Sequence, residues 1–550
     1  MRLVLILFAF EILFQPIRCS ELNIDYEGVD VIPSIPLKNN SPIYSLVERL
    51  YIAENTLPPS YGFISTAHDI HQSLNNIQYV KDNSSNAYNQ SLIDSFYSQY
   101  ALNKLKNKLS TWIDCSIGID YLYRKTKVVM GEDSTYYSRF KDADFINRYD
   151  DKWNLFDLSF QAAYNNRYFF SYRFGLKEYW KELREKVHGI PKNLLEMDNN
   201  FNQQSIFIAN FNKFKFFYGK TKYSIGLGES GKLFLSDQST ALDAVGFSLN
   251  QNGKLVLHHI TAIIDNITDD HLRETEPPKY LFIHRLEINP LKRFRVGLTE
   301  LLLINSYMKW QYMNPFKIYH NVSNFASTNV ISAIDAEILV KKNLILYGTF
   351  AIDELDVDLV EQDFSQKDKS SLAYQFGLKY YEIFHIPATI MILEYIQLDK
   401  WFYNHYAGNL GSDRDLTITH TESVPYPEGV EIYTRHLGYT IGGNSETIYI
   451  KFIIKCFTLE YQYSELGEPL MFQIPFQDIS VLNAISEVFE YRNIIGIRYS
   501  NQYINEHLGI QLSAHLFQVK NYHNIAKENK TFPEINIKVN YKFDKWDLSL

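Results

Sequence analysis

Apolar and polar side chains alternate with a period of two along most of the chain after residue 111. In one such run the apolar positions are Cys115, Ile117, Ile119, Tyr121 and Tyr123. The pattern recurs at 156–164, 168–177, 374–380, 448–455, 508–516 and 535–543. Because successive side chains of a strand point to opposite faces, each run predicts a β-strand with one apolar and one polar face. The polar face of 168–177 carries Arg173 and Lys177, so it needs contact with water.

Two architectures accommodate such strands. A soluble sandwich or solenoid turns the apolar face inward, whereas a transmembrane barrel turns it outward into lipid and lines its lumen with the polar face. Short turns such as 341–343 alternate with long polar connections such as 354–371 and 408–429, which is typical of outer-membrane barrels. At about 24 residues per strand and connection, residues 111–550 hold roughly 18 strands. We therefore predict an all-β fold, a transmembrane antiparallel β-barrel.

The first 110 residues have a different pattern. Apolar side chains recur at helical spacing in 41–53, 65–74 and 95–109, so 21–110 is predicted to be a small, mostly helical periplasmic module. Residues 1–20 are predicted to be a signal peptide, because a positive end precedes an apolar stretch too short to span a bilayer as a helix. Cys19 is a minor candidate for lipidation there, since the residues before it make a poor lipobox.

Composition narrows the classes of function. The chain has 54 Lys and Arg against 63 Asp and Glu, a net charge of −9, and so lacks the basic character of a nucleic-acid binder. Its 41 Tyr and 37 Phe suit β-structure and the aromatic girdles of membrane barrels. The spacing of Cys115 and Cys456 suggests neither a metal site nor a disulfide scaffold, although one bond between them stays an alternative. We predict no cofactor and no metal.

The stretch 216–247 contains three glycines in a recognisable spacing. Gly226, Gly228 and Gly231 match the dinucleotide fingerprint G-x-G-x-x-G. That fingerprint needs a helix directly after it, whereas a short β-like run follows here. We therefore favour sharp bends between two strands, where glycine supplies a positive φ or a close approach of backbones.

Six segments carry a family resemblance when they are taken in order. They are YSLVERLYIAENTLPPSYGFISTAHDIHQSL (44–74), GKTKYSIGLGESGKLFLSDQSTALD (219–243), KYLFIHRLEINPLKRFRVGLTE (279–300), YMNPFKIYHN (312–321), NLILYGTFAIDEL (343–355) and HLGYTIGGNSE (436–446). Together they resemble the Wzi family of capsule-assembly proteins, which are bacterial outer-membrane β-barrels. The resemblance implies a lectin-like barrel that holds surface or capsular polysaccharide on the cell, and it does not imply a hydrolase.

Two features depart from the expected pattern. The family often has a tryptophan near the first glycine-rich segment, where this chain has Tyr223, Ser224 and Ile225. Outer-membrane barrels commonly end on an aromatic residue, and this chain ends at Leu550. Either Phe543 closes the last strand before a short tail, or the terminal strand is non-standard.

Candidate polysaccharide-binding residues fall into two groups. Arg285 and Glu287 share one face of a predicted strand with Asn289; they either contact a glycan from the lumen or form a lumenal salt-bridge ladder. The others lie beside turns or in the last family-like segment, where capping of the turn is the alternative role; they are Asp237, Asp243, Asn314, His320, Asn321 and Asn444. His258 and His259 are neighbours on a strand, so they point to opposite faces and are not predicted to share a metal.

The leading hypothesis is a non-enzymatic outer-membrane barrel that binds surface or capsular polysaccharide and helps to assemble or retain it. Its partners would be that polysaccharide and outer-membrane lipid. The alternative is a general diffusion porin or solute channel, whose lumenal charges would set its selectivity. A third, weaker hypothesis is a secreted soluble β-protein or hydrolase. A glycosidase needs two carboxylates across a cleft, and no motif singles out such a pair.

Overall fold

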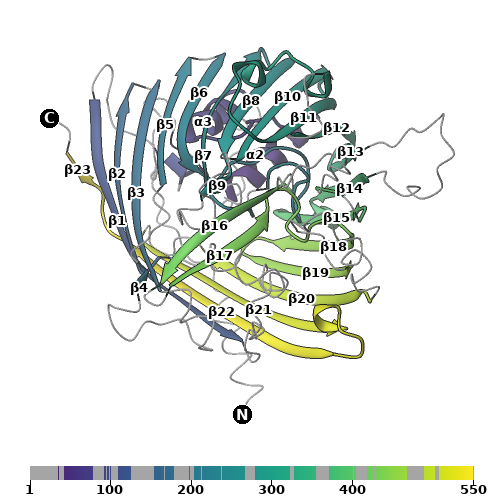
Figure 1. The fold of residues 1–550 in the computed structure, drawn as a ribbon. Coiled ribbons are helices and arrows are strands. Elements are labelled where there is room, and N and C mark those ends of the chain that lie inside the picture. The colour runs from purple at the N-terminus through teal and green to yellow at the C-terminus, as the bar shows by residue number, and fades with distance from the viewer. Residues whose placement is uncertain are drawn as a thin grey trace.

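Eighteen antiparallel strands form a closed barrel in the computed structural model of this chain (Figure 1). The barrel strands are β1 (Leu109–Arg124), β2 (Phe156–Tyr164), β3 (Tyr168–Glu178), β5 (Gln204–Phe211), β6 (Phe214–Thr221), β7 (Leu242–Gln251), β8 (Leu255–Ile263), β10 (Lys279–Leu291), β11 (Phe294–Asn305), β12 (Thr328–Lys341), β13 (Leu344–Glu354), β14 (Ser371–Tyr381), β15 (Thr389–Leu398), β18 (Ser445–Ile454), β19 (Phe457–Leu466), β20 (Glu490–Asn501), β21 (Leu508–Lys520) and β22 (Lys530–Lys542). Each strand pairs with its neighbours in this order, and β22 pairs with β1 to close the sheet. The predicted fold class is confirmed.

The structure describes a defined part of the chain. The described residues are 35, 37, 42–77, 92–94, 96–97, 100, 109–124, 154–165, 167–178, 197–198, 204–211, 213–236, 238–266, 279–321, 328–354, 371–400, 402–403, 418–426, 429–467, 488–501 and 507–548. The predicted signal peptide, with Cys19, lies outside them.

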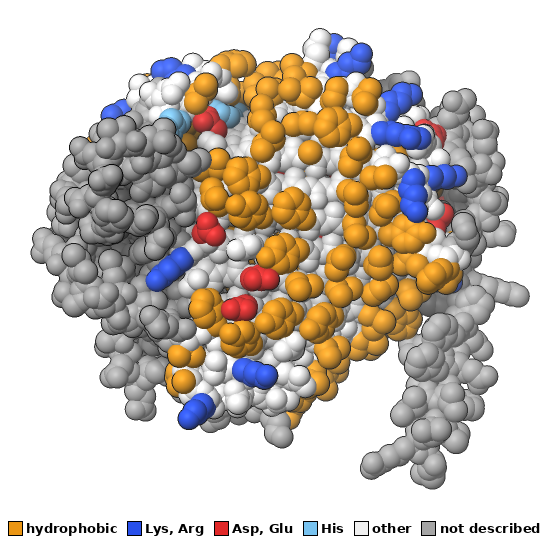
Figure 2. Space-filling view, turned by 90° about the vertical axis from the view of Figure 1, so that its right-hand side faces the viewer, with side chains coloured by type: hydrophobic (Ala, Val, Ile, Leu, Met, Phe, Trp, Pro, Cys, Tyr) orange, Lys and Arg blue, Asp and Glu red, His pale blue; other side chains and the backbone are white. Residues whose placement is uncertain are grey.

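Side chains along each strand alternate between the lumen and the outer surface. On β10, Arg285 and Glu287 are buried inside, whereas Ile288 is 38 % exposed on the other face. Across β11 and β12, Leu298 and Ile334 continue this apolar outer face. Figure 2 shows apolar side chains spread over one outer face of the barrel, with few charged side chains among them. An apolar outside and a polar inside are the arrangement expected of a barrel surrounded by lipid.

Connections are short at one end of the barrel and longer at the other. Asn165, Asn252 and Asn343 take a positive φ in the turns between β2 and β3, β7 and β8, and β12 and β13. Asparagine tolerates this left-handed conformation better than most residues, so it suits tight turns between strands. The opposite end carries longer connections, among them 222–241, 306–327 and 399–444. We call the two ends the short-turn end and the long-loop end.

Two of the predicted N-terminal helices are present. They are α2 (Pro42–Ala53) and α3 (Ala67–Asn75), and their buried faces pack together around Leu46, Val47 and Ile70. α3 begins with a reciprocal cap, because the Thr66 hydroxyl accepts from the Asp69 N–H at 3.2 Å and the Asp69 carboxylate accepts from the Thr66 N–H at 2.9 Å. Among the described helices, none is long and apolar enough to cross a membrane.

The third predicted helix is only partly described. Residues 92–94, 96–97 and 100 are helical, but β1 already begins at Leu109. The prediction that this helix reaches residue 109 was therefore wrong at its C-terminal end. Leu109 belongs to the barrel wall because it pairs with Tyr164 of β2.

Several short elements flank the barrel strands. β4 (Met197–Asp198) extends the sheet beside β3. A separate three-stranded sheet consists of β9 (Asp265–Asn266), β16 (Thr419–Tyr426) and β17 (Gly429–His436). The described residues also include the 3-10 turns η4 (Trp310–Met313), η5 (Tyr319–Asn321), η6 (Ile383–His385) and η7 (Tyr522–Asn524).

The last strand resolves the two alternatives for the C-terminal end. β22 ends at Lys542, and the Phe543 N–H donates to the Cys115 carbonyl at 3.0 Å. β23 (Trp546–Asp547) then pairs beside β1. The strand thus closes at Phe543 and a short tail follows.

Cys115 and Cys456 are both free thiols, so the alternative of a disulfide between them was wrong.

Candidate functional site

The connection between β6 and β7, residues 222–241, crosses the lumen. β6 and β14 are separated by six strands on the shorter way round the barrel. Even so, the N–H groups of Glu229 and Ser230 each donate to the Glu394 carboxylate on β15 at 2.8 Å. Gln375 on β14 donates to a carbonyl of the same connection at 2.9 Å. We call 222–241 the crossing segment, because it ties one wall of the barrel to the other.

The three glycines of the crossing segment make its bends. Gly226, Gly228 and Gly231 have φ of 109°, 118° and 153°. A Cβ on Gly228 would lie 2.2 Å from the Gln375 amide, so the backbone approaches the wall more closely than another residue permits. The predicted sharp bends are confirmed. No helix follows Gly231 in the described chain, so the nucleotide-binding alternative fails.

Aromatic side chains of the long-loop end seal the crossing segment from the other side. The Tyr403 hydroxyl donates to the Leu233 carbonyl at 2.6 Å and accepts from the Tyr439 N–H at 2.8 Å. Burial raises the pKa of Tyr403 above its usual range, so the hydroxyl stays neutral and keeps its proton. Tyr403 shares one buried apolar cluster with Tyr223 and with Phe63 from the N-terminal region.

This interior core fills one sector of the lumen. Its wall residues include Ile208 on β5, Ile283 on β10, Leu303 on β11 and Ile396 on β15. The described parts of β18–β22 contribute no residue to it. The core also includes Trp112 of β1 and Ala163 of β2, so it spans β1–β15. The lumen therefore has an apolar, filled sector, and a second sector runs along β18–β22 and the remainder of β1–β3.

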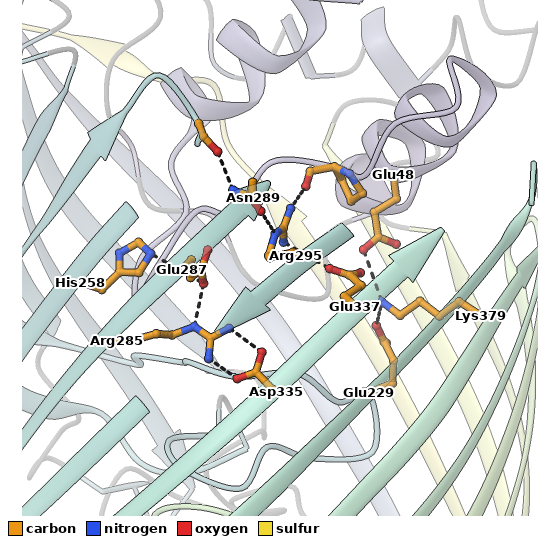
Figure 3. Close-up of polar contacts among 12 residues, drawn as sticks. Glu48, Glu229, His258, Arg285, Glu287, Asn289, Arg295, Asp335, Glu337 and Lys379 are labelled. Carbon is orange, nitrogen blue, oxygen red and sulfur yellow. Dashed lines mark hydrogen bonds and ion pairs between the residues drawn. The ribbon is translucent and has the colours of Figure 1, made fainter. Parts of the chain in front are cut away.

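Helix α2 is fixed to the wall by a partly buried charge cluster, shown in Figure 3. The Lys379 ammonium on β14 lies 3.4 Å from the Glu48 carboxylate of α2 and 2.5 Å from the Glu229 carboxylate of the crossing segment. The Tyr381 hydroxyl donates to Glu48 at 2.6 Å. One lysine thus joins the N-terminal helix, the crossing segment and the barrel wall.

The segment between the two helices covers the short-turn end of the lumen. The Leu57 N–H donates to the Lys292 carbonyl in the turn between β10 and β11 at 2.8 Å. At the start of α3, Asp69 pairs with Lys215 of β6 at 2.5 Å, and Lys215 also donates to the Ile64 carbonyl at 3.2 Å. These contacts hold the N-terminal residues inside the barrel outline, where Figure 1 draws α2 and α3.

Arg285 and Glu287 form the centre of a second buried network (Figure 3). The Arg285 guanidinium donates to Glu287 at 2.7 Å, to Thr299 at 2.9 Å and with two nitrogens to Asp335. His258 lies 3.8 Å from Glu287 on the next strand. Arg285 is only 2 % exposed, so each charge is compensated inside the protein. The predicted lumenal salt bridge is present, and a glycan contact at these residues stays a prediction.

A third charge group connects this network to the N-terminal region. Arg295 lies 3.3 Å from Glu337 and donates to Asn289 at 3.0 Å and to the Pro58 carbonyl. Asn289 in turn donates to the Gly253 carbonyl. The prediction that Asn289 shares a face with Arg285 and Glu287 is confirmed.

The sector along β18–β22 and β1–β3 is lined with paired charges instead. Glu460 accepts from His515 at 2.8 Å and lies 3.4 Å from Arg498. Further along, Lys538 lies 3.2 Å from Asp120. Other pairs on this lining are Arg173 with Asp157 and Lys542 with Asp114. We call this lining the polar sector.

The remaining candidate residues do not gather at one place. Asp243 is exposed at the long-loop end of β7, on the face opposite the buried Leu242 and Ala244. Asn444 precedes β18 with a φ of 57°, and its carbonyl accepts from the Gly467 N–H at 2.8 Å. Asp237 lies outside the described residues.

Asn314, His320 and Asn321 lie on the outside of the barrel wall. They belong to a connection whose Tyr319 covers His284, the outward neighbour of Arg285, with ring centroids 4.3 Å apart. The Asn314 side chain accepts from the Phe316 N–H at 3.1 Å, which is the turn-capping role of the alternative. The wall of the barrel therefore separates these three residues from Arg285 and Glu287.

His258 and His259 point to opposite faces of β8, as neighbours on a strand are predicted to do. His258 points into the lumen and contacts Ser248 at 2.8 Å, whereas His259 points outward and contacts Thr261 at 3.2 Å. Within the described residues, no group of three or more His, Cys, Asp or Glu side chains could hold a metal ion.

Comparisons with known proteins address the fold. No protein-family model matches the sequence, and no curated protein sequence matches it. Among solved structures, Wzi, an outer-membrane protein of Escherichia coli involved in group 1 capsule assembly and described as a carbohydrate-binding β-barrel, is similar with a TM-score of 0.50 at 10 % identity, covering 92 % of this chain and 99 % of that one. OprD from Pseudomonas aeruginosa has a TM-score of 0.41 at 9 % identity, covering 80 % and 95 %. OccAB3 from Acinetobacter baumannii has a TM-score of 0.38 at 11 % identity, covering 79 % and 99 %.

The fold and the surface define the class of the protein. A closed barrel of 18 antiparallel strands with an apolar outer face is the form in which β-structure crosses a membrane. The chain is a bacterial outer-membrane β-barrel. At 10 % identity the similarity to Wzi shows a shared fold and leaves the activity to be argued from the site.

Proposed function

We propose that this barrel is not an enzyme but binds surface or capsular polysaccharide and helps to assemble or retain it on the cell surface. The observation that supports this most is the interior core, because an open solute channel needs a continuous aqueous path through the lumen. Here the crossing segment and the N-terminal region instead bury apolar side chains such as Phe63 and Leu233 inside the barrel. The likeness in fold to a barrel described as carbohydrate-binding supports the same proposal.

The long-loop end is where the proposed binding would take place. In outer-membrane barrels the longer loops face the outside of the cell. Asn314, His320 and Asn321 also lie at this end but are held against the outer wall, so Asp243 and Asn444 are the described candidates in reach of a polymer outside the barrel. Arg285 and Glu287 are buried within the lumen, so they would support the site indirectly.

The direct test is binding of the purified protein to the polysaccharide extracted from its own host. Asn444→Gly removes the side-chain amide while keeping the positive φ, and Asp243→Asn removes one charge. We expect each variant to weaken binding, and Asn252→Gly, a similar change in a turn at the short-turn end, to leave binding unchanged. If the wild-type protein binds no host glycan and its deletion leaves the surface layer attached, the proposal is wrong.

The polar sector favours a second candidate function, a solute channel. Paired charges such as Lys538 and Asp120 on one side of the interior core would line a narrow path and set its selectivity. Conductance in a planar bilayer separates the two functions. A stable open pore whose ion selectivity changes in Lys538→Gln supports the channel, whereas a silent barrel that binds glycan supports the first proposal.

A further inference from the structure

The connection between β11 and β12 folds back along the outside of the barrel. Its η4 and η5 turns place Tyr312 and Tyr319 over Phe282, Leu302 and Ile304, which point outward from β10 and β11 and are nevertheless fully buried. Tyr319 is tied to the wall, because its N–H donates to the Glu300 carboxylate at 2.9 Å and its hydroxyl donates to the Tyr312 carbonyl at 3.1 Å. Residues 306–321 therefore replace lipid against this part of the wall. We call them the outer flap.

The flap seals a polar group that the outer face would otherwise expose to lipid. Glu300 accepts from His284 at 3.0 Å and lies within 3.4 Å of the Ser332 hydroxyl, all three side chains being on the outward side of their strands. A carboxylate in contact with hydrocarbon is costly, and Tyr319 covers this one. The flap is thus a fixed part of the wall and not a loop that extends away from it.

The free side of the flap is apolar and aromatic. Trp310 is 87 % exposed, Tyr307 82 % and Phe316 79 %, and Ile318 is exposed beside them. These side chains continue the apolar outer face that Leu298 and Ile334 form on the strands next to the flap. That continuity indicates that the flap meets the same surroundings as the rest of the outer face.

All charged side chains of the flap are basic. Residues 306–321 contain Lys309, Lys317 and His320 but no Asp or Glu, in a chain whose net charge is −9. No ion pair joins either lysine to a carboxylate among the described residues. Long basic side chains reach from an apolar surface towards charged groups at its edge.

We propose that the outer flap is an in-plane anchor in the outer leaflet. Trp310, Phe316 and Ile318 insert among acyl chains, and Lys309 and Lys317 contact the phosphate groups of anionic lipid. Aromatic side chains favour the boundary between hydrocarbon and headgroups, and a basic edge adds attraction to anionic lipid. The flap lies at the long-loop end, because β11 leaves the short-turn end at residue 294, so the leaflet it meets is the outer one.

The first test measures the surroundings of Trp310 by fluorescence quenching in proteoliposomes. The chain has six tryptophans, so the signal of Trp310 is the difference between wild type and Trp310→Phe. We expect acyl-brominated phosphatidylcholine to remove most of this difference signal and aqueous iodide to leave it unchanged. Quenching by iodide without quenching by brominated lipid would overturn the proposal.

The second test addresses the anionic lipid. Lipid A added to the detergent-solubilised protein is expected to raise the temperature at which the folded, fast-migrating gel band is lost. Lys309→Gln/Lys317→Gln is expected to lose most of that increase, and Lys292→Gln/Lys342→Gln, in turns at the other end, to keep it. An equal increase in both double variants would contradict a phosphate contact at the flap.

Two other binding partners of the outer flap would give different results in these experiments. A second copy of the chain on the flap would give a dimer in detergent that Trp310→Phe dissociates. A glycan stacked on Trp310 would change the difference fluorescence when soluble polysaccharide is added to lipid-free protein. Either result overturns the lipid anchor.

Discussion

At the scale of single residues, the lumen holds its charges in closed groups. The Arg285 guanidinium is planar and presents a fork of donors, so it can satisfy Asp335 and Glu287 together. The guanidinium lies against Gly297, the strand partner of Glu287, and a Cβ on Gly297 would lie 2.3 Å from it, so no other residue fits at that position. Such a group is stable when complete and costly when one partner is removed.

Arg285→Met is therefore expected to lower the free energy of unfolding by about 3–5 kcal/mol, because two carboxylates stay buried without their partner. Unfolding in urea with the protein in detergent micelles measures this change. The control is Lys530→Gln, which breaks a more exposed pair with Glu528 and should cost about 0–1 kcal/mol. Equal effects of the two changes would mean that Arg285 is already solvated.

His436 adds a dependence on pH outside the barrel strands. Its ring is buried against Tyr403, and desolvation lowers the pKa of His436 to about 4. An unfolded histidine has a pKa of about 6.5, so the unfolded chain binds a proton that the folded chain excludes. The contribution of His436 to stability is complete above about pH 6.5 and is lost as the pH falls towards 4.

We expect hydrogen exchange at residues 437–442 to become faster between pH 7 and pH 5 after correction for the intrinsic exchange rate. His436→Phe keeps an aromatic ring beside Tyr403 but takes up no proton, so its corrected exchange should stay constant over the same range. A wild-type profile as constant as that of the variant would show that His436 does not control this segment.

At the scale of elements, the crossing segment links parts that are far apart in sequence. It joins β6 to β7, donates to Glu394 on β15 and reaches Lys379, which also holds helix α2. A pore through the apolar sector would require this segment to leave the far wall.

Gly228→Ala should displace the crossing segment and open the lumen. The added Cβ would lie 2.2 Å from both the Gln375 amide and the Gly231 carbonyl, whereas a Cβ on Gly226 meets nothing within 4 Å. Both glycines have a positive φ, so Gly226→Ala is a control for backbone strain alone. In planar bilayers we expect Gly228→Ala to open more often than wild type and more often than Gly226→Ala. Equal conductance of both variants would refute a role for this close contact.

At the scale of the whole molecule, the closed sheet is what makes the protein stable in a membrane. The pairing of β22 with β1 leaves the ladder continuous around the barrel. The protein should fractionate with the outer membrane and migrate faster on a gel before heating than after it. A soluble protein whose mobility does not change with heating would contradict the barrel itself.

The sequence predicted the strands because burial on one face imposes a period of two. The run at 156–164 became β2 residue for residue, whereas the run at 508–516 became the first part of β21, which continues to Lys520. The helical spacing in 41–53 predicted α2. Periodicity says nothing about what fills a lumen. It gave no sign that Glu229, Lys379 and Glu48 meet, since their contact depends on a segment that crosses between non-adjacent strands. Three glycines in close spacing were the one local signal of that crossing.

The candidate site was predicted less well for a related reason. Arg285 and Glu287 were placed on the correct face, because neighbours two residues apart share it. Asn314, His320 and Asn321 were chosen as candidates on their position beside turns alone. A turn can fold to either side of the wall, and here the burial of Leu302 and Ile304 outside the barrel decided the direction.

The filled sector also constrains the order in which the molecule can be assembled. The interior core packs against β1–β15 and includes no described residue of β18–β22, and the barrel is closed by the pairing of β22 with β1. The N-terminal helices and the crossing segment can therefore be seated while the sheet is still an open, curved ribbon. The last strands then wrap around a finished interior, and no part of the chain has to be threaded through a completed ring.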